Sequence, residues 1–238
     1  MSPRCFRPKR HRRARKEPKM AKIDLKKELK ELYFPSAREI TVVDVPPMNF
    51  LMIDGRGDPN TAPEFKAAIE VLYAVSYALK FMVKKRTPER DYVVLPLEGL
   101  WWFEGKDRFD LEDKGSWCWT AMIMQPEFIT GEMVEQALEE VAGKKDLPAL
   151  PKLRFERFHE GLSVQIMHIG PFSAEGPTTE RLHSFIEGHG YEMRGKHHEI
   201  YLSDPRRVAP ERLKTVIRQP VAKRAACGAR SLPEEADP

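Results

Sequence analysis

The sequence lacks the features that mark several common protein classes. It has three cysteines, Cys5, Cys118 and Cys227, and no CxxC pair, so neither a disulfide framework nor a zinc knuckle is indicated. It contains no run of 18 apolar residues and no apolar signal segment, which predicts a cytoplasmic protein with no membrane span. No P-loop, no GxGxxG after a strand, no HExxH and no GxSxG occurs, so nucleotide, zinc-protease and serine-hydrolase chemistry have no local support.

Metal ligation has little support either. The chain has seven histidines, but the adjacent His197 and His198 point to opposite sides of an expected strand, and no other pair has ligand spacing. We therefore expect no metal site and no cofactor.

Positive charge is concentrated at one end of the chain. Residues 1–19 carry nine Lys or Arg residues against the single Glu17, a local charge of +8, whereas the net charge of the whole chain is +4. The body is therefore net negative, which argues against a nucleic-acid-binding surface on it. The arm has three prolines and no periodic apolar positions, so it is expected to be disordered.

The two ends are expected to contribute nothing to the core. Met20 begins the stretch MAKIDLKKEL, which looks like a natural start, so residues 1–19 are expected to lie upstream of the true initiation site. A tether to nucleic acid or to an anionic surface is the alternative, and the intact mass of the natively expressed protein distinguishes the two. Residues 222–238 are expected to form a disordered tail.

The body, residues 20–221, is predicted to form one α+β domain. Its length and the 41% hydrophobic content of the chain are sufficient for a core. Thr61 as N-cap and Pro63 at the first helical position predict the start of a long helix, and Thr130 is predicted to cap a second one. The elements predicted for the first half are strands over 40–45 and 49–54, a helix over 63–86, strands over 91–102 and 116–125, and a helix over 130–143.

The second half repeats the order of elements of the first half. A strand over 162–169 precedes a helix that begins at Pro177, and two further strands end at Pro220, much as the first half ends at Gln125-Pro126. We interpret this order as a duplicated β-α-β-β module, with module one at about 38–126, a connecting helix at 130–143 and module two at about 160–221. Two such modules can join edge to edge into one antiparallel sheet, with helices on one face and a central cleft.

The stretch 197–221, HHEIYLSDPRRVAPERLKTVIRQPV, carries the best functional clue. Glu199 and Tyr201 alternate with Ile200 and Leu202, so the acid and the tyrosine share one face of a strand. A carboxylate in an apolar strand must reach solvent, pair with a cation or line a cavity. Two interpretations remain open: an aromatic-lined cavity around Glu199, or tryptophans that fill the core while Glu199 pairs with Arg206, Arg207 or Arg218 at an exposed edge.

The wording EIYLSDP, followed by a proline-started turn and a strand that ends in QPV, resembles the closing segment of the GyrI-like small-molecule-binding family. The resemblance implies two β-α-β-β modules that form a cleft, with Glu199 as the ligand-contacting acid and Tyr201 beside it. No helix-turn-helix segment precedes the modules, which is typical of a stand-alone member. The segments LEGLWW and WCWTAMIM resemble the stand-alone branch of cyclopropanoid cyclopropyl hydrolases, which open the strained ring of DNA-alkylating natural products.

We therefore expect a protein that binds hydrophobic, planar small molecules, with hydrolysis of cyclopropane-type electrophiles as its candidate detoxifying activity. Glu199 would position or deprotonate a water molecule, and Tyr201 would hydrogen-bond the oxygen on which charge develops. The alternatives are sequestration of a drug or toxin without turnover and shielding of a protein partner such as DNA gyrase. The sequence does not indicate the oligomeric state. The expected ligand contacts are Trp101, Trp102, Trp117, Trp119, Tyr92 and His168, although His168 also suits a hydrogen-bonded place in the core.

Overall fold

A computed structural model describes residues 22–104 and 114–224. The predicted basic arm and nearly all of the predicted tail lie outside these residues. The strands are β1 (Thr41–Val45), β2 (Met48–Arg56), β3 (Glu98–Trp102), β4 (Cys118–Gln125), β5 (Arg154–Phe158), β6 (Gly161–Ile169), β7 (Tyr191–Met193), β8 (His197–Tyr201) and β9 (Lys214–Lys223). The helices are α1 (Leu25–Glu28), α2 (Lys30–Tyr33), α3 (Pro63–Arg86), α4 (Gly131–Ala142) and α5 (Gly176–Gly188), with short 3-10 turns η1 (Pro88–Arg90), η2 (Lys114–Ser116), η3 (Leu150–Lys152), η4 (Phe172–Ala174) and η5 (Pro210–Arg212).

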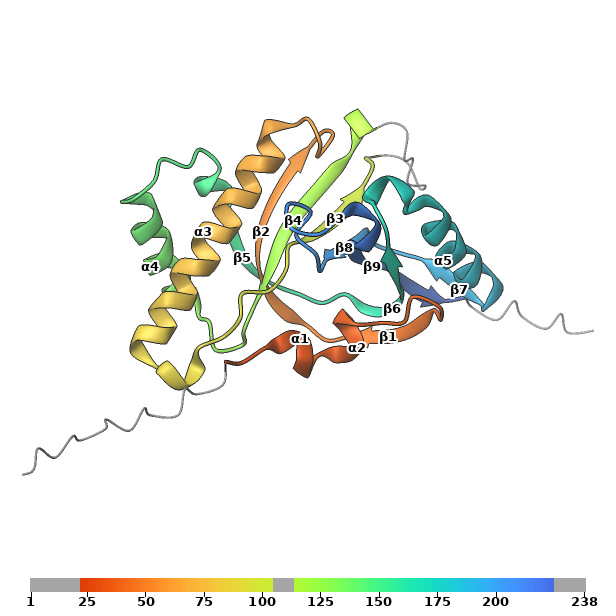
Figure 1. Cartoon of the computed structure of the whole chain (residues 1–238), viewed down its shortest axis with the longest axis horizontal. Helices are drawn as coiled ribbons and strands as arrows, with labels where there is room; N and C mark the ends of the chain where they lie inside the picture. Colours follow the sequence, from red (N-terminus) through yellow and green to blue (C-terminus); the bar gives the residue numbers. More distant parts are fainter. Residues whose placement is uncertain (1–21, 105–113, 225–238) are drawn as a thin grey trace, which may run out of the picture.

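The strands form one antiparallel sheet in the order β1-β6-β9-β8-β3-β4-β2-β5, and β7 adds to β9 off this path. The first half contributes β2, β4 and β3 as neighbours, and the second half contributes β6, β9 and β8 in the same relative order. The halves meet where β3 pairs with β8. This arrangement is the α+β sheet predicted from the repeated order of elements, with the halves joined edge to edge (Figure 1).

Two long bent strands curl the sheet. Val45 of β1 pairs with Gly161 of β6, and Met48 of β2 pairs with Phe158 of β5, so the register continues unchanged across both bends. Residues 46 and 47, which separate β1 from β2, are both prolines and have no N–H to donate to a ladder. Residues 41–56, which contain β1 and β2, therefore pair with residues 154–169, which contain β5 and β6, and the two segments reach both edges of the sheet.

Helices α3 and α5 pack on the same face of the sheet. Residues opposite each other in an antiparallel pair point to the same side. By this register Trp119, Trp101, Glu199 and Ile217 share one face. Phe65 of α3 contacts Trp119 at one end, and α5 packs on Ile217 at the other end. In Figure 1, α3 and α5 accordingly lie on either side of β4, β3 and β8.

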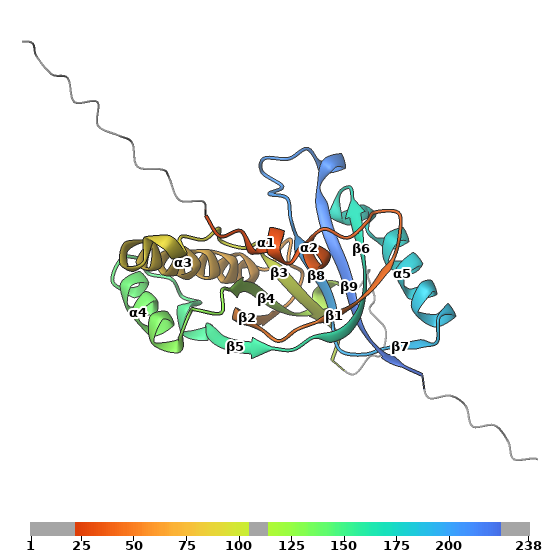
Figure 2. The same ribbon diagram turned by 90° about the horizontal axis from the view of Figure 1, so that it is seen from below.

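The opposite face holds a buried ionic chain beneath α2. His198 lies between Glu98 and Glu160, with nitrogen–oxygen distances of 3.0 Å on each side, and Arg218 donates to Glu160 at 3.0 Å. All four side chains are at most 3% exposed. Tyr33 of α2 donates to Glu98 at 2.9 Å, which fixes α2 against β3 (Figure 2).

Several local predictions need correction. The N-cap of α3 is Ala62 and makes no side-chain cap bond, so Thr61 does not cap this helix. The strand predicted over 91–102 is shorter, because the continuous strand covers only Glu98–Trp102, and Tyr92 forms an isolated bridge with Ile23. Strands β5 and β7 were not predicted. None of the helices in the described part of the chain is both long and apolar enough to cross a bilayer.

Candidate functional site

The predicted acid lies on the strip of sheet between α3 and α5. Gly99 of β3 pairs with Glu199 of β8, and Trp101 pairs with His197. Tyr201 follows Glu199 on the same face because strand side chains alternate. The structure therefore brings Glu199, Tyr201 and Trp101 together where the two halves of the sheet meet.

Glu199 has a tyrosine and a histidine as partners. The hydroxyl of Tyr201 donates to Glu199 Oε2 at 2.7 Å, and His197 Nε2 lies 3.3 Å from Oε1. The Glu199 side chain is 13% exposed, so its carboxylate is neither a surface group nor fully enclosed.

The arginine pairing that the sequence left open for Glu199 is not formed. Arg218 bonds Glu160 on the opposite face of the sheet, and Arg206 and Arg207 both pair with Asp204. Because these three arginines are engaged elsewhere, the interpretation in which Glu199 forms an ion pair at an exposed edge does not hold.

Three tryptophans form an aromatic cluster beside Glu199. The ring centroids of Trp101 and Trp117 are 5.4 Å apart, and Phe65 of α3 lies 5.6 Å from Trp101 and 4.9 Å from Trp119. The three indoles are 2%, 7% and 1% exposed, so they belong to the core as well as to the face that carries Glu199. Trp101 lies across Gly99: a Cβ at that position would be 2.8 Å from its indole nitrogen.

Tyr201 has a strongly perturbed hydroxyl. Burial raises the pKa of Tyr201 well above its ordinary value, and the negative charges of Glu199 and Glu175 raise it further, while the Trp101 side chain lowers it. Phe172 of η4 packs edge-on against the Tyr201 ring, with centroids 5.5 Å apart. The hydroxyl therefore remains protonated at neutral pH and acts as a hydrogen-bond donor.

Glu175 is a second acid at this place that the sequence did not reveal. It is 7% exposed, and burial followed by the charge of Glu199 raises its pKa to about 9. In the sequence Glu175 precedes Gly176 and Pro177, a pattern typical of a solvent-exposed turn before a helix. The sequence contains no signal for this proximity. It becomes visible only in the structure, where Phe172 of the preceding η4 packs on Tyr201.

Three of the predicted ligand contacts do not join this group. Trp102 points to the opposite face, where Lys196 Nζ lies 3.3 Å from its ring centroid. Tyr92 packs against Phe128, with centroids 5.8 Å apart, away from β8. His168 faces the same side as Glu199, but its ring nitrogens lie 3.0 Å from Thr178 Oγ1 and 3.3 Å from the Pro171 carbonyl, which is the core arrangement.

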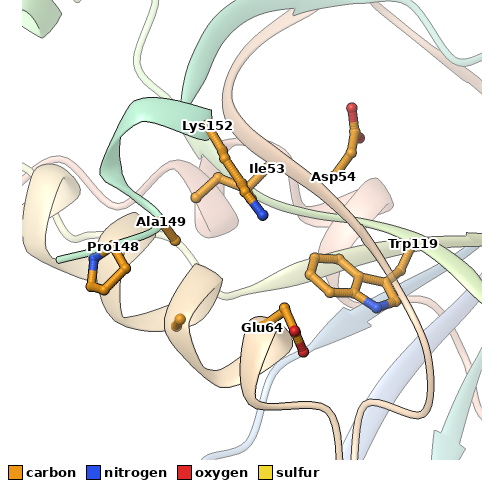
Figure 3. A pocket seen from close by; sticks show the side chains of 8 residues that line it. Ile53, Asp54, Glu64, Trp119, Pro148, Ala149 and Lys152 are labelled. Carbon is orange, nitrogen blue, oxygen red and sulfur yellow. The ribbon is translucent and has the colours of Figure 1, made fainter.

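A cavity of about 380 Å³, part of it open to solvent, adjoins the same aromatic cluster. It lies between β2, the start of α3 and η3, and Figure 3 shows Trp119, Glu64 and Lys152 around it. Glu199 is not among its lining residues. Trp119 therefore borders this cavity and also belongs to the aromatic cluster beside Glu199.

Metal chemistry has no evident place among the described residues. Within 22–104 and 114–224, no group of three or more His, Cys, Asp or Glu side chains is placed to hold a metal ion. The chemistry available at the strip is that of one carboxylate, one buried carboxyl group, a tyrosine hydroxyl and aromatic faces.

The fold and the strip together define an α+β protein with a carboxylate, a tyrosine and aromatic rings where its two halves meet. A family model, the GyrI-like small molecule binding domain, matches residues 38–222, and the chain belongs to this family. The resemblance to the GyrI-like family is thereby confirmed over the greater part of the chain.

Solved structures agree with this assignment. An uncharacterized conserved protein from Listeria innocua is 46% identical, with a TM-score of 0.78, over 84% of this chain and 100% of that one. Two structures described as hydrolases from the same organism are 41% and 44% identical, with TM-scores of 0.73 and 0.74, over 84% and 85% of this chain and all of theirs. A search of curated proteins found no match.

Proposed function

We propose that this protein binds hydrophobic, planar small molecules at the strip between α3 and α5 and hydrolyses electrophiles that carry a strained cyclopropane. The observation that carries the proposal is the half-buried Glu199, which has no arginine or lysine ion pair among the described residues and lies beside Tyr201 and Trp101. Aromatic side chains stack on flat ligands, and one acid among them supplies either a base or a counter-charge.

The chemistry needs few groups. Ring strain drives the opening of a cyclopropane that is conjugated to a carbonyl group. Glu199 accepts a proton from the attacking water. The hydroxyl of Tyr201, which donates to Glu199 in this structure, turns to the carbonyl oxygen of the ligand, where negative charge develops. Trp101 and Trp117 are nearly buried, so their rings move apart to admit the planar body of the ligand, which brings the water and the ring carbon into reacting geometry.

Two relatives support hydrolysis over binding alone. The two Listeria innocua structures described as hydrolases exceed 40% identity to this chain and are covered over their full length. Sequestration uses the same residues, with Glu199 serving only as a counter-charge, so turnover distinguishes the two functions.

The test is incubation with a cyclopropane-bearing alkylator, followed by mass spectrometry for a product that has gained one water. Glu199→Gln should lose about 10²- to 10⁴-fold in turnover, the usual contribution of a general base. Its ligand affinity, followed by tryptophan fluorescence, should change far less. Glu192→Gln, an exposed site on β7, is the matched control and should behave as the wild type.

Other outcomes favour the alternatives. Stoichiometric binding without product supports sequestration of a drug or toxin. Capture of a protein partner such as DNA gyrase in the absence of any small molecule supports a shielding function, and it would leave the aromatic cluster without a catalytic purpose.

A further inference from the structure

Glu175 lies at the start of α5, on the same face of the sheet as the candidate site. Thr215 of β9 pairs with Tyr201 of β8 on one side and with His168 of β6 on the other, so its side chain points toward the same face. Phe172, three residues before Glu175, packs on the Tyr201 ring. The start of α5 therefore lies directly over the strands that carry the proposed catalytic groups.

The Glu175 carboxyl group is buried and incompletely satisfied. The side chain is 7% exposed, and among the described residues its Oε1 has no hydrogen-bond partner. Such an atom is costly to bury, most of all when it carries charge. Burial and the nearby charge of Glu199 favour the protonated form of Glu175, and its free oxygen leaves it able to bond a ligand.

The groups that face Glu175 are mostly acidic or neutral. From β8 they are Glu199 and Tyr201, with His197 next to Glu199, and on β6 His168 points to the same face. Burial and then the charge of Glu199 raise the pKa of Glu175, and the side chain of Thr215 lowers it. A buried acid beside another negative charge is harder to ionise, so Glu175 keeps its proton at neutral pH.

We propose that Glu175 is the proton donor of this site and works with Glu199 as one carboxyl–carboxylate pair. This inference rests on the proposed hydrolysis and deepens it, because it assigns the acid as well as the base. A protonated carboxyl group is a stronger acid than the tyrosine hydroxyl, so it completes the proton transfer that Tyr201 only assists by hydrogen bonding.

The step balances as the addition of one water. The water oxygen bonds to the ring carbon, the carbon–carbon bond of the cyclopropane breaks, and its electron pair moves through the conjugated system to the carbonyl oxygen. That oxygen takes the proton of Glu175, and the water gives a proton to Glu199. One proton then passes from Glu199 to Glu175, which restores the pair for the next cycle.

The first test is the titration of Glu175 itself, followed by carbon-13 NMR of the glutamate side-chain carboxyl groups. The resonance that disappears in Glu175→Gln, or in Glu175→Asp if the first variant does not fold, is expected to titrate with a midpoint near about 9. In Glu199→Gln the midpoint should fall but remain above that of an ordinary glutamate, because burial persists. A midpoint in the ordinary range, or one that Glu199→Gln leaves unchanged, overturns the pair.

The second test is the kinetics of Glu175→Gln. The amide keeps the size of the acid but has no transferable proton, so turnover of the cyclopropane alkylator should fall by about 10²-fold or more while affinity is retained. Glu175→Asp should recover part of the rate, and Glu180→Gln, an exposed acid on α5, is the matched control.

The two ideas fail in different ways. Wild-type protein that gives no hydrolysis overturns both the proposed function and the donor role. Hydrolysis that depends on Glu199 but survives in Glu175→Gln overturns only the donor role and leaves the proposed function standing.

Discussion

At the scale of single residues, two glycines allow the aromatic cluster to form. A Cβ at Gly99 would meet the indole of Trp101, and one at Gly55 would meet the ring of Trp119. The Trp101 ring lies across the backbone of its own strand, β3, and the Trp119 ring lies across the backbone of the neighbouring β2, which only a residue without a side chain permits. The aromatic cluster beside Glu199 therefore requires a residue without a Cβ at positions 55 and 99.

Gly99→Ala should move the Trp101 indole off the strand and weaken ligand binding. An aromatic contact contributes about 0.5–1.5 kcal/mol beyond area burial, so the dissociation constant of a planar aromatic ligand should rise up to about tenfold. Overpacking of this kind also lowers the free energy of unfolding by about 1–3 kcal/mol. Fluorescence titration and urea unfolding measure the two effects.

Gly188→Ala is the matched control for that substitution. Gly188 lies at the end of α5, and a Cβ there meets nothing within 4 Å. Equal effects of the two substitutions would mean that the position of the Trp101 ring does not govern binding.

Sequence alternation predicted part of the candidate site. It placed Glu199 with Tyr201, and Trp117 with Trp119, because side chains in a strand alternate between faces. The same rule separates the adjacent Trp101 and Trp102, so only one of them can face Glu199. Glu175 could not be found this way, since the proximity of a turn residue to a strand depends on how η4 folds back over the sheet.

At the scale of elements, local signals located the helices well. Proline at the start marked α3, and Thr130 caps α4 by accepting the N–H of Met133 at 3.3 Å. Strands β5 and β7 escaped prediction because their pairing is long-range and half of their residues are solvent-exposed. The continuous register of β1 with β6 and of β2 with β5 joins the first half of the chain to the second, so no single segment of the sequence predicts it.

Thr130→Ala should lower the free energy of unfolding by about 1 kcal/mol, the typical value of a lost N-cap bond. Thr61→Ala provides the comparison, because Thr61 has the sequence of a cap but α3 begins after Ala62 without a side-chain cap bond. Urea unfolding of both variants should show a loss only for Thr130. An equal loss at Thr61 would show that it acts as a cap in solution.

At the scale of the whole molecule, the buried ionic chain joins the halves beneath the site. His198 of β8 lies between Glu98 of β3, from the first half, and Glu160, which precedes β6 of the second half. Burial opposes the charge of His198, but the two carboxylates outweigh it and raise its pKa to about 9. Neighbouring His198 and Arg218 lower the pKa of Glu160 to about 2 against the effect of burial. Because His198 is adjacent to Glu199, the chain also holds the site strand in place.

These two shifts predict how the stability of the protein varies with pH. The lowered pKa of Glu160 contributes stability above its ordinary value of 4.5, and this contribution is lost as pH falls toward about 2. The raised pKa of His198 contributes stability below its ordinary value of 6.5, and this contribution is lost as pH rises through about 9. Both contributions are complete only between these ordinary values, at mildly acidic pH.

Glu160→Gln should therefore destabilise the protein most at mildly acidic pH, by about 3–5 kcal/mol, because it leaves Arg218 and His198 buried without their shared carboxylate. The difference from wild type, measured by urea unfolding at a series of pH values, should shrink toward pH 3 and again toward pH 9. Glu192→Gln, on the exposed β7, should give a small difference that does not follow this curve. A loss in Glu160→Gln that is the same at every pH would mean that Glu160 joins the halves by its shape and hydrogen bonds, and that its charge has no part in it.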